Sequence, residues 1–302
     1  MMNPFSLKAF DGFDIKGYYW QSDNDSIAIL VLSHGMAENI ERYIAFAEFL
    51  NTHNIDVIGF HQRGHGPNAE MLGYLGDNGW DAMKEDLRYV INSLKIEHEN
   101  KPVILMGHSM GSFLVRDFLK TYSSLIDGVI LSGTGFYSRL TLKLGKWLAE
   151  KDVKKHGDKH ISELVHKMAF ESNNKKVKLP RTDMDWLTRD SKIVEDYINN
   201  PLCGQKHPSS FYALFFNGLE GVFSQAAEVN FKSDLPMFIF SGDSDPIGNY
   251  GKGVQQTVKY YKEHGYRVSL KLYKDGRHEM LNEINHDEVF EDISNWIISQ
   301  VK

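Results

Sequence analysis

A glycine-flanked serine is the clearest sign of chemistry in this chain, because residues 107–111 read G-H-S-M-G with Ser109 at the centre. The segment follows a buried-strand pattern at 103–106 and precedes a helical pattern at 112–122, which predicts a tight strand-to-helix turn. Glycines leave room for such a turn, and the helix N-terminus brings backbone amides close to the serine hydroxyl. We therefore predict that Ser109 is a nucleophile. A structural turn with an incidental serine explains the flanking glycines less well.

A serine hydroxyl becomes a useful nucleophile only when a positioned histidine accepts its proton and a carboxylate orients that histidine. The chain has 13 histidines, so chain order and context must select the base. His278 follows the last strand pattern in D-G-R-H-E, where a loop would reach over the end of a sheet. His286 is a rival, but it lies in a helical pattern that runs toward Trp296. His108 adjoins the serine, and its side chain should diverge from the hydroxyl. We predict that His278 is the base.

Two aspartates compete for the role of the orienting carboxylate, because residues 241–246 read S-G-D-S-D-P after a strand pattern. Asp245 lies further out on this loop and is better placed to turn toward a histidine. Asp243 is typical of a turn or capping carboxylate. Chemistry alone leaves both open, with a modest preference for Asp245.

Negative charge on an acyl oxygen needs amide donors close to the nucleophile. The amide of Met110 directly follows the serine. Residues 33–38, S-H-G-M-A-E, end a strand pattern at 27–32, where a loop would overhang the nucleophile. The amide of Met36 is therefore the second candidate for this oxyanion hole, with an ordinary turn as the alternative reading.

Six short runs rich in apolar residues predict the strands that position these loops. Near-continuous hydrophobicity within each run favours strands buried on both faces, hence a mostly parallel sheet covered by helices. A hairpin signal, Asp11-Gly12, separates extended patterns at 6–10 and 13–20 and predicts an antiparallel edge. The six runs are residues 27–32, 56–60, 103–106, 128–131, 237–240 and 268–273.

The alternation of strands and helices stops within residues 136–234, where helical patterns predominate. Leu140, Leu144, Trp147 and Leu148 share one helical face, and an aromatic run follows later. We predict a core of residues 1–135 and 235–302 with a helical cap at 136–234. Members of the aromatic run could line an acyl pocket or bury the cap against the core; they are Phe211, Tyr212, Leu214, Phe215, Phe216 and Phe223.

Composition excludes several classes of partner and site. A net charge of -6 gives no basis for binding nucleic acid, and Cys203 is the only cysteine, so an intrachain disulfide or a cysteine metal cluster cannot form. The first eleven residues lack the pattern of a signal peptide, and no apolar run is long enough to cross a membrane, so we expect a cytoplasmic protein. Lysines between 143 and 178 alternate with acidic residues, which favours a solvated face and at most transient contact of the cap with a membrane surface.

These motifs together resemble the monoacylglycerol lipase and lysophospholipase family of serine hydrolases, a serine-aminopeptidase-like branch of the α/β hydrolases. The resemblance implies the α/β-hydrolase fold, assigns the catalytic acid to Asp245 and supports His278 as the base. His61 stands where the family commonly has aspartate, and Arg63 and His65 in that turn are expected to be structural. The segments that carry the resemblance are H-G-M-A-E at 34–38, E-R-Y at 41–43, F-H-Q-R-G-H-G at 60–66, G-H-S-M-G at 107–111, G-D-S-D at 242–245 and G-R-H-E at 276–279.

The expected reaction is cleavage of a small or lipid-like carboxylic ester through an acyl-enzyme, without a metal or organic cofactor. A thioesterase or a serine aminopeptidase on the same scaffold is the first alternative. An aminopeptidase needs carboxylates to hold a free amine, and the candidates are Asp183, Asp185 and Glu195. A non-catalytic binding protein of the same fold is the other alternative.

Overall fold

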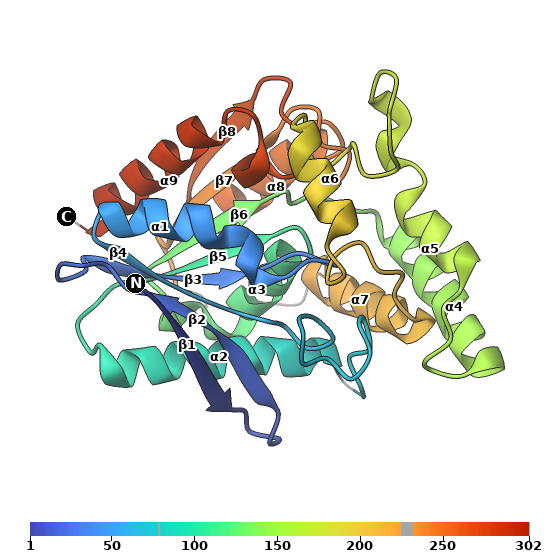
Figure 1. The fold of residues 1–302 in the computed structure, drawn as a ribbon, viewed down its shortest axis with the longest axis horizontal. Helices are drawn as coiled ribbons and strands as arrows, with labels where there is room; N and C mark the ends of the chain where they lie inside the picture. The colour runs from blue at the N-terminus through green and yellow to red at the C-terminus, as the bar shows by residue number, and fades with distance from the viewer. Residues whose placement is uncertain (78, 225–231, 302) are drawn as a thin grey trace.

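The computed structural model describes residues 1–77, 79–224 and 232–301, and these form one eight-stranded sheet covered by helices on both faces (Figure 1). The sheet order is β1-β2-β4-β3-β5-β6-β7-β8. The first three strands in this order are antiparallel neighbours, and all later neighbours are parallel. The strands are β1 (Met2–Lys8), β2 (Asp14–Trp20), β3 (Ala28–Ser33), β4 (Ile55–Phe60), β5 (Val103–His108), β6 (Gly128–Ser132), β7 (Pro236–Gly242) and β8 (Arg267–Tyr273).

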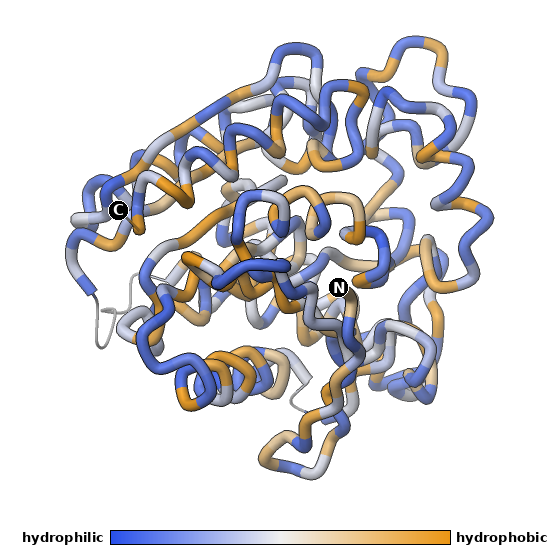
Figure 2. The backbone as a smooth tube through the Cα atoms, turned by 60° about the vertical axis from the view of Figure 1, so that its left-hand side comes forward, coloured by the Kyte–Doolittle hydropathy of each residue, from blue (hydrophilic) through white to orange (hydrophobic). Residues whose placement is uncertain are grey.

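The helices between these strands divide into two layers because the side chains of each strand alternate between the faces of the sheet. In β3, Ile29 and Val31 pack in the apolar core under one layer, and Leu30 and Leu32 pack under the other. The first layer holds α2 (Gly79–Glu97), α3 (Met110–Tyr122) and α8 (Lys252–Glu263); the second holds α1 (Ile44–Thr52) and α9 (His286–Val301). Short 3-10 turns lie at Ile40–Tyr43, Ser123–Leu125, Asn173–Lys176 and Met280–Asn282. In Figure 2 hydrophobic segments run through the middle of the backbone, whereas the hairpin of β1 and β2 extends away from it.

The described residues between β6 and β7 form four α-helices, which stand beside the sheet on the right of Figure 1. They are α4 (Arg139–His156), α5 (Glu163–Phe170), α6 (Ser191–Asn199) and α7 (Ser209–Val222). The inward face of α4 is formed by Leu142, Gly145 and Ala149, and a Cβ added at Gly145 would lie 2.8 Å from the ring of Phe216 in α7. The absence of a side chain at this glycine lets the two helices approach closely.

The predicted mostly parallel sheet and its antiparallel hairpin are both confirmed. One strand prediction is wrong in detail, because β8 is not buried on both faces. It ends the sheet, so its outer side meets solvent, and Leu270 is 39% exposed. The helical face of α4 that carries Leu140 and Trp147 is also exposed, at 82% and 54%. No helix among the described residues is both long and apolar enough to cross a membrane.

Candidate active site

Ser109 lies on the turn between β5 and α3 with strained backbone angles, φ 51° and ψ −118°. A residue other than glycine rarely adopts a positive φ, so the surrounding packing must hold this conformation in place. The neighbouring glycines allow it. A Cβ on Gly107 would collide with the carbonyl of Gly111, and a Cβ on Gly111 would collide with the carbonyl of Ser33 in β3. The sequence thus produces a sharp turn that presents the Ser109 side chain above the end of the sheet.

His278 and Asp245 form a buried pair at the ends of β8 and β7. The Nδ1 atom of His278 lies 3.0 Å from Oδ1 of Asp245, and their side chains are 2% and 0% exposed. The carboxylate also accepts hydrogen bonds from the Ile247 amide at 2.8 Å and the Ser241 hydroxyl at 3.0 Å. Every strong donor around Asp245 therefore favours its ionised form.

The pKa values of this pair move in opposite directions. Burial disfavours both charged forms, but the charge and hydrogen bonds that the partners exchange outweigh it. The pKa of His278 is raised and that of Asp245 is lowered. His278 can thus take up a proton while Asp245 remains a carboxylate, as a general base with an orienting acid requires.

The loop after β3 lies directly behind the serine. A Cβ built on Gly35 would lie 3.2 Å from the Cβ of Ser109. The next amide, that of Met36, and the amide of Met110 donate to no other group within the described residues. Both residues line the same cavity as Ser109. Two unpaired amides beside a strained serine could bind an oxyanion.

Two buried histidines hold this loop in shape. His34 accepts from the Gln62 amide through Nε2 at 3.0 Å, so its Nδ1 donates to the Gly35 carbonyl at 2.8 Å. His65 accepts from the Ala37 amide at 3.3 Å through Nε2, and its Nδ1 donates to the Arg63 carbonyl at 2.9 Å. Burial lowers the pKa of both imidazoles to about 3 and keeps them neutral. The turn at residues 60–66 was expected to be structural, and its Gln62 and His65 bond to the loop after β3.

A buried ionic network joins the loop after β3, residues 34–38, to the loop after β8 that carries His278, here called the histidine loop. Arg42 donates to Glu279 through two nitrogens at 2.7 and 2.5 Å and to Glu38 at 2.8 Å. Glu38 also accepts from the Gly35 amide and the Tyr43 hydroxyl. Sequence reasoning assigned no role to these residues. Their only signal was that they belong to the motifs at 34–38, 41–43 and 276–279.

Residues just before α6 also contact the histidine loop. The ring of Trp186 lies 4.9 Å from the ring of His278, measured between centroids. The carbonyls of Trp186 and Leu187 accept from the amides of His278 and Glu279 at 3.4 and 2.7 Å. The sequence did not predict this contact, because Trp186 and His278 lie about 90 residues apart in the chain.

A cavity of about 370 Å³ is lined by Ser109 and by residues of α4, α5 and α7. This volume is within the range of small-molecule sites. Three members of the aromatic run line it, namely Tyr212, Phe215 and Phe216, as predicted for at least part of that run. Phe211 instead packs edge-on against His207, with ring centroids 4.2 Å apart. Other apolar walls come from Leu142, Leu144, Leu148, Val165, Met168 and Leu219.

The rival histidines and aspartate lie elsewhere or have other partners. His286 begins α9 and bonds to the Glu283 carbonyl. His108 packs beside His278, with ring centroids 4.8 Å apart, but its Nδ1 pairs with the Ser132 hydroxyl at 3.1 Å. Burial, with the neighbouring imidazole charge, lowers the pKa of His108 to about 4. Asp243 accepts from the Asp275 amide at 2.8 Å and so stabilises a turn.

Comparison with known proteins identifies the family. A family model described as serine aminopeptidase, S33 (Hydrolase_4) matches residues 24–285. The chain belongs to this family. It is an α/β hydrolase of the esterase and lipase type. The match confirms the resemblance and the fold class that were inferred from the motifs.

Individual relatives of this S33-family hydrolase match it over nearly its whole length. A monoacylglycerol lipase from Mycolicibacterium smegmatis is 24% identical and covers 93% of this chain and 92% of its own. A carboxyl esterase from Bacillus coagulans, solved in complex with glycerol, has a TM-score of 0.88 at 24% identity, covering 100% and 99% of the two chains. A lipase solved in an open form has a TM-score of 0.89 at 20% identity, with both chains covered completely.

Proposed function

We propose that this hydrolase cleaves carboxylic esters with an apolar acyl chain, such as monoacylglycerols or lysophospholipids, through a Ser109–His278–Asp245 triad. The observation that carries the proposal is the apolar cavity, because it joins Ser109 and His278 at one end to the cap helices at the other. An acyl chain gains roughly 0.8 kcal/mol for each methylene that it buries in such a wall. The relative from M. smegmatis is a monoacylglycerol lipase, which supports the same substrate class.

The proposed reaction has two acyl-transfer steps. His278 takes the proton of Ser109, the oxygen attacks the ester carbonyl, and the amides of Met36 and Met110 bind the oxyanion. The protonated His278 then gives its proton to the leaving alcohol, and water releases the acid with His278 again as base. Ser109 Oγ makes no hydrogen bond within the described residues of the free protein, so its bond to His278 forms when substrate binds, as is common for catalytic hydrogen bonds.

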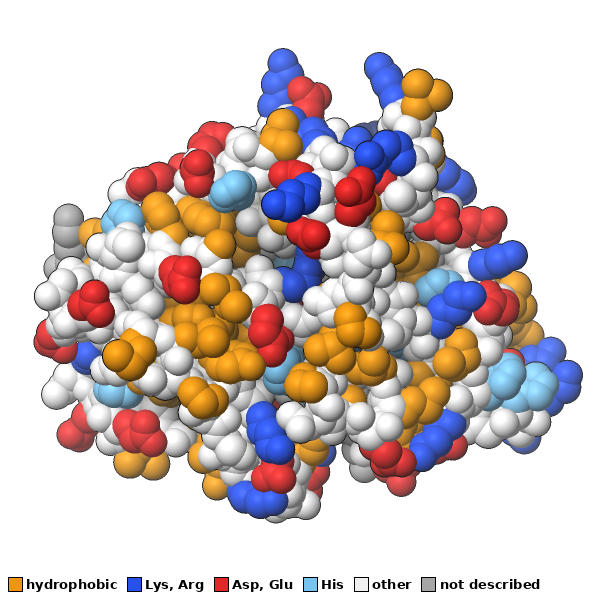
Figure 3. All heavy atoms as spheres, viewed as in Figure 1, with side chains coloured by type: hydrophobic (Ala, Val, Ile, Leu, Met, Phe, Trp, Pro, Cys, Tyr) orange, Lys and Arg blue, Asp and Glu red, His pale blue; other side chains and the backbone are white. Residues whose placement is uncertain are grey.

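The proposal includes a division of the chain. Residues 1–135 and 235–302 form the core, and 136–234 form a cap that closes the acyl site. Transient contact of the cap with a lipid surface is part of the same proposal, because Leu140, Leu144 and Trp147 are more than half exposed among lysines and carboxylates. Figure 3 has apolar side chains on the right-hand side of the molecule, where α4 and α5 lie.

Aminopeptidase activity is the second candidate, favoured by the name of the family model. None of the three carboxylates considered for holding a free amine, Asp183, Asp185 and Glu195, lines the cavity. Asp185 accepts from the Arg181 amide at 2.7 Å and from the Thr182 hydroxyl, and Glu195 pairs with Arg181 at the surface. The two carboxylates that do line the cavity, Glu38 and Glu279, are engaged by Arg42. Ester cleavage is therefore the better match.

The test is a set of p-nitrophenyl esters of increasing acyl length, assayed beside amino-acid p-nitroanilides, with fluorophosphonate labelling of Ser109. We expect labelling, and kcat/KM that rises from acetyl toward medium chains by up to about fourfold per methylene before levelling off. Anilides turned over faster than every ester would establish the aminopeptidase alternative. Tight ligand binding without labelling or turnover would establish the non-catalytic alternative.

A further inference from the structure

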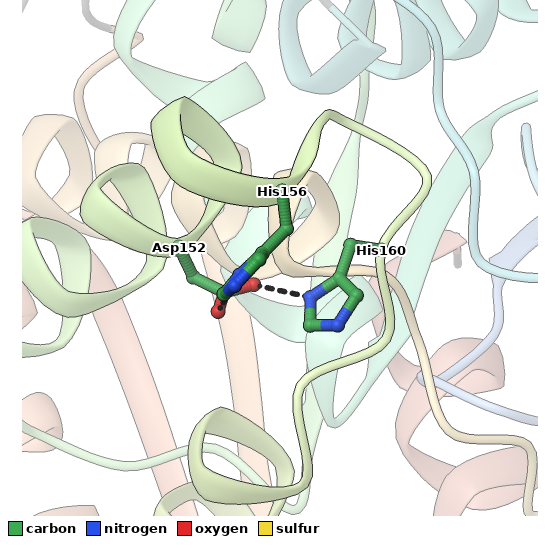
Figure 4. A group of neighbouring side chains, drawn as sticks. All are labelled: Asp152, His156 and His160. Atoms are coloured by element: carbon green, nitrogen blue, oxygen red, sulfur yellow. Dashed lines mark hydrogen bonds and ion pairs between the residues drawn. The ribbon is translucent and has the colours of Figure 1, made fainter.

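Two histidines and an aspartate gather their side chains at the C-terminal end of α4, away from the cavity (Figure 4). Asp152 and His156 are one helical turn apart, and His160 returns to them from the loop that follows. His156 Nδ1 lies 3.0 Å from Asp152 Oδ1, and His160 Nδ1 lies 2.8 Å from Asp152 Oδ2. One donor atom from each residue lies within 4.8 Å of both others. This spacing is close enough for all three to reach one ion.

The cluster has a support that a chance surface contact would lack. The hydroxyl of Ser209, the first residue of α7, donates to Asp152 Oδ2 at 2.6 Å. The amide of Ser209 donates to the carbonyl of His160 at 2.8 Å. Both the carboxylate and the loop that carries the second imidazole are thereby held in place. A second layer of hydrogen bonds that orients the ligands is typical of metal sites.

We propose that Asp152, His156 and His160 bind a divalent transition-metal ion, Zn²⁺ being the best match, at a site independent of the active site. Two imidazole nitrogens and one carboxylate oxygen suit zinc, whereas calcium and magnesium prefer oxygen ligands throughout. The imidazoles are 37% and 40% exposed, so the ion can enter from solvent and water can take the remaining position. None of the three residues lines the cavity beside Ser109.

The ion would act as a clamp within the cap. Asp152 and His156 belong to the end of α4, His160 belongs to the following loop, and Ser209 begins α7. The same two helices supply apolar walls of the cavity, including Leu142 from α4 and Phe215 from α7. Binding at their ends therefore stabilises the cap and slows its local opening. The ion takes no part in ester chemistry.

Two of the lysines next to the three ligands have other partners. Lys159, next to His160, extends to Glu70 at 2.8 Å, and Lys151, next to Asp152, lies over the ring of Trp147 at 5.1 Å. The alternative is a purely hydrogen-bonded cluster in which Asp152 accepts from both imidazoles. A metal ion takes the place of the proton on each coordinating nitrogen, and a neutral imidazole can keep its proton on the other ring nitrogen, so the two cases differ in saturable binding of an ion.

The experiment is calorimetric titration of the tag-free, chelator-treated Ser109→Ala protein with ZnCl₂. This variant separates metal binding from the proposed hydrolysis, so either proposal can fail alone. We expect saturable binding of one ion per chain, a Tm that rises to a plateau, and slower hydrogen exchange at residues 153–162 and 207–212. Co²⁺ should give the visible absorption of a four-coordinate site.

The variants His156→Gln and His160→Gln should each weaken zinc binding at least tenfold and abolish the rise in Tm. Asp152→Asn should do the same, although its side chain can still accept from Ser209. His286→Gln is the matched control, because His286 is a partly exposed histidine 3.3 Å from Asp287, and no third ligand joins this pair within the described residues. The control should bind zinc like the parent. Absence of saturable binding, or binding that survives the double variant of His156 and His160, would overturn the proposal.

Discussion

Arg42 and Glu279 are 237 residues apart in the chain and form a two-pronged buried ion pair, with N–O distances of 2.7 and 2.5 Å. Glu279 directly follows His278, and Arg42 also donates to Glu38 in the loop after β3. The side chains of Arg42 and Glu279 are only 11% and 5% exposed. The pair thus fixes the position of the loop after β3 relative to the loop that carries His278, and the proposed chemistry uses residues from both loops.

Arg42→Met should destabilise the protein strongly, because it leaves two buried carboxylates without their cation. Removal of one partner of a buried ion pair costs about 3–5 kcal/mol. Urea unfolding measures the loss. Arg42→Lys keeps the charge but not the two-pronged contact, so it should lose less. Equal stability of all three proteins would contradict this account of the network.

The same pair predicts a pH dependence of stability. Burial alone would raise the pKa of Glu279, but Arg42 outweighs it and lowers the pKa well below the ordinary 4.5. A carboxyl group whose pKa is lower in the folded state contributes stability above its unfolded pKa and loses it as the pH falls. The free energy of unfolding should therefore fall as the pH drops below about 4.5. The Glu279→Gln variant should have a flatter profile in this range.

Ser109→Ala should abolish ester hydrolysis and fluorophosphonate labelling and leave the fold intact. Loss of a triad member costs on the order of 10⁴ to 10⁶ in turnover. Circular dichroism and urea unfolding serve as folding controls. A variant that retains a tenth of the parent activity would remove the basis for the proposed mechanism.

Asp245→Asn should reduce kcat by around 10⁴, because an amide no longer holds the required histidine tautomer. It should also move the acidic limb of the kcat/KM profile to lower pH, because burial then lowers the pKa of His278 without the opposing carboxylate. Asp243→Asn is the matched control on the same loop. It should cost roughly 1 kcal/mol of stability through its turn contact and leave the pH profile unchanged. The reverse order of kinetic damage would assign the acid to Asp243.

Gly35→Ala should slow hydrolysis by about 10²- to 10³-fold, the range for loss of one oxyanion donor. The added Cβ would lie 2.6 Å from Glu38 Oε1 and 3.2 Å from Ser109 Cβ, so the loop that carries the Met36 amide must shift. Gly221→Ala is the control, since its Cβ would meet only Asp117 Oδ1, at 3.9 Å. The ratio of the two rates of fluorophosphonate labelling gives the result. Equal rates would argue against this loop as part of the oxyanion hole.

Local patterns in the sequence determined much of this protein. A turn such as the one at Ser109 depends on neighbouring glycines and on the strand and helix that flank it, so a short window contains its cause. The strand patterns were equally local, because a run of apolar residues suits a strand that is covered on both faces. Chain order and the resemblance then selected His278 and Asp245 as candidates. The described structure brings those two side chains within hydrogen-bonding distance, and their catalytic roles stay predictions.

Tertiary structure alone decided the features that depend on residues far apart in the chain. The exposure of β8 follows from its place at the sheet edge, which its own apolar residues could not reveal. The contact of Trp186 with His278 and the ion pair of Arg42 with Glu279 join separate segments. The support of Asp152 by Ser209 does the same within the cap. Burial, pKa and metal-binding geometry arise from packing among such segments, and no single stretch of sequence contains them.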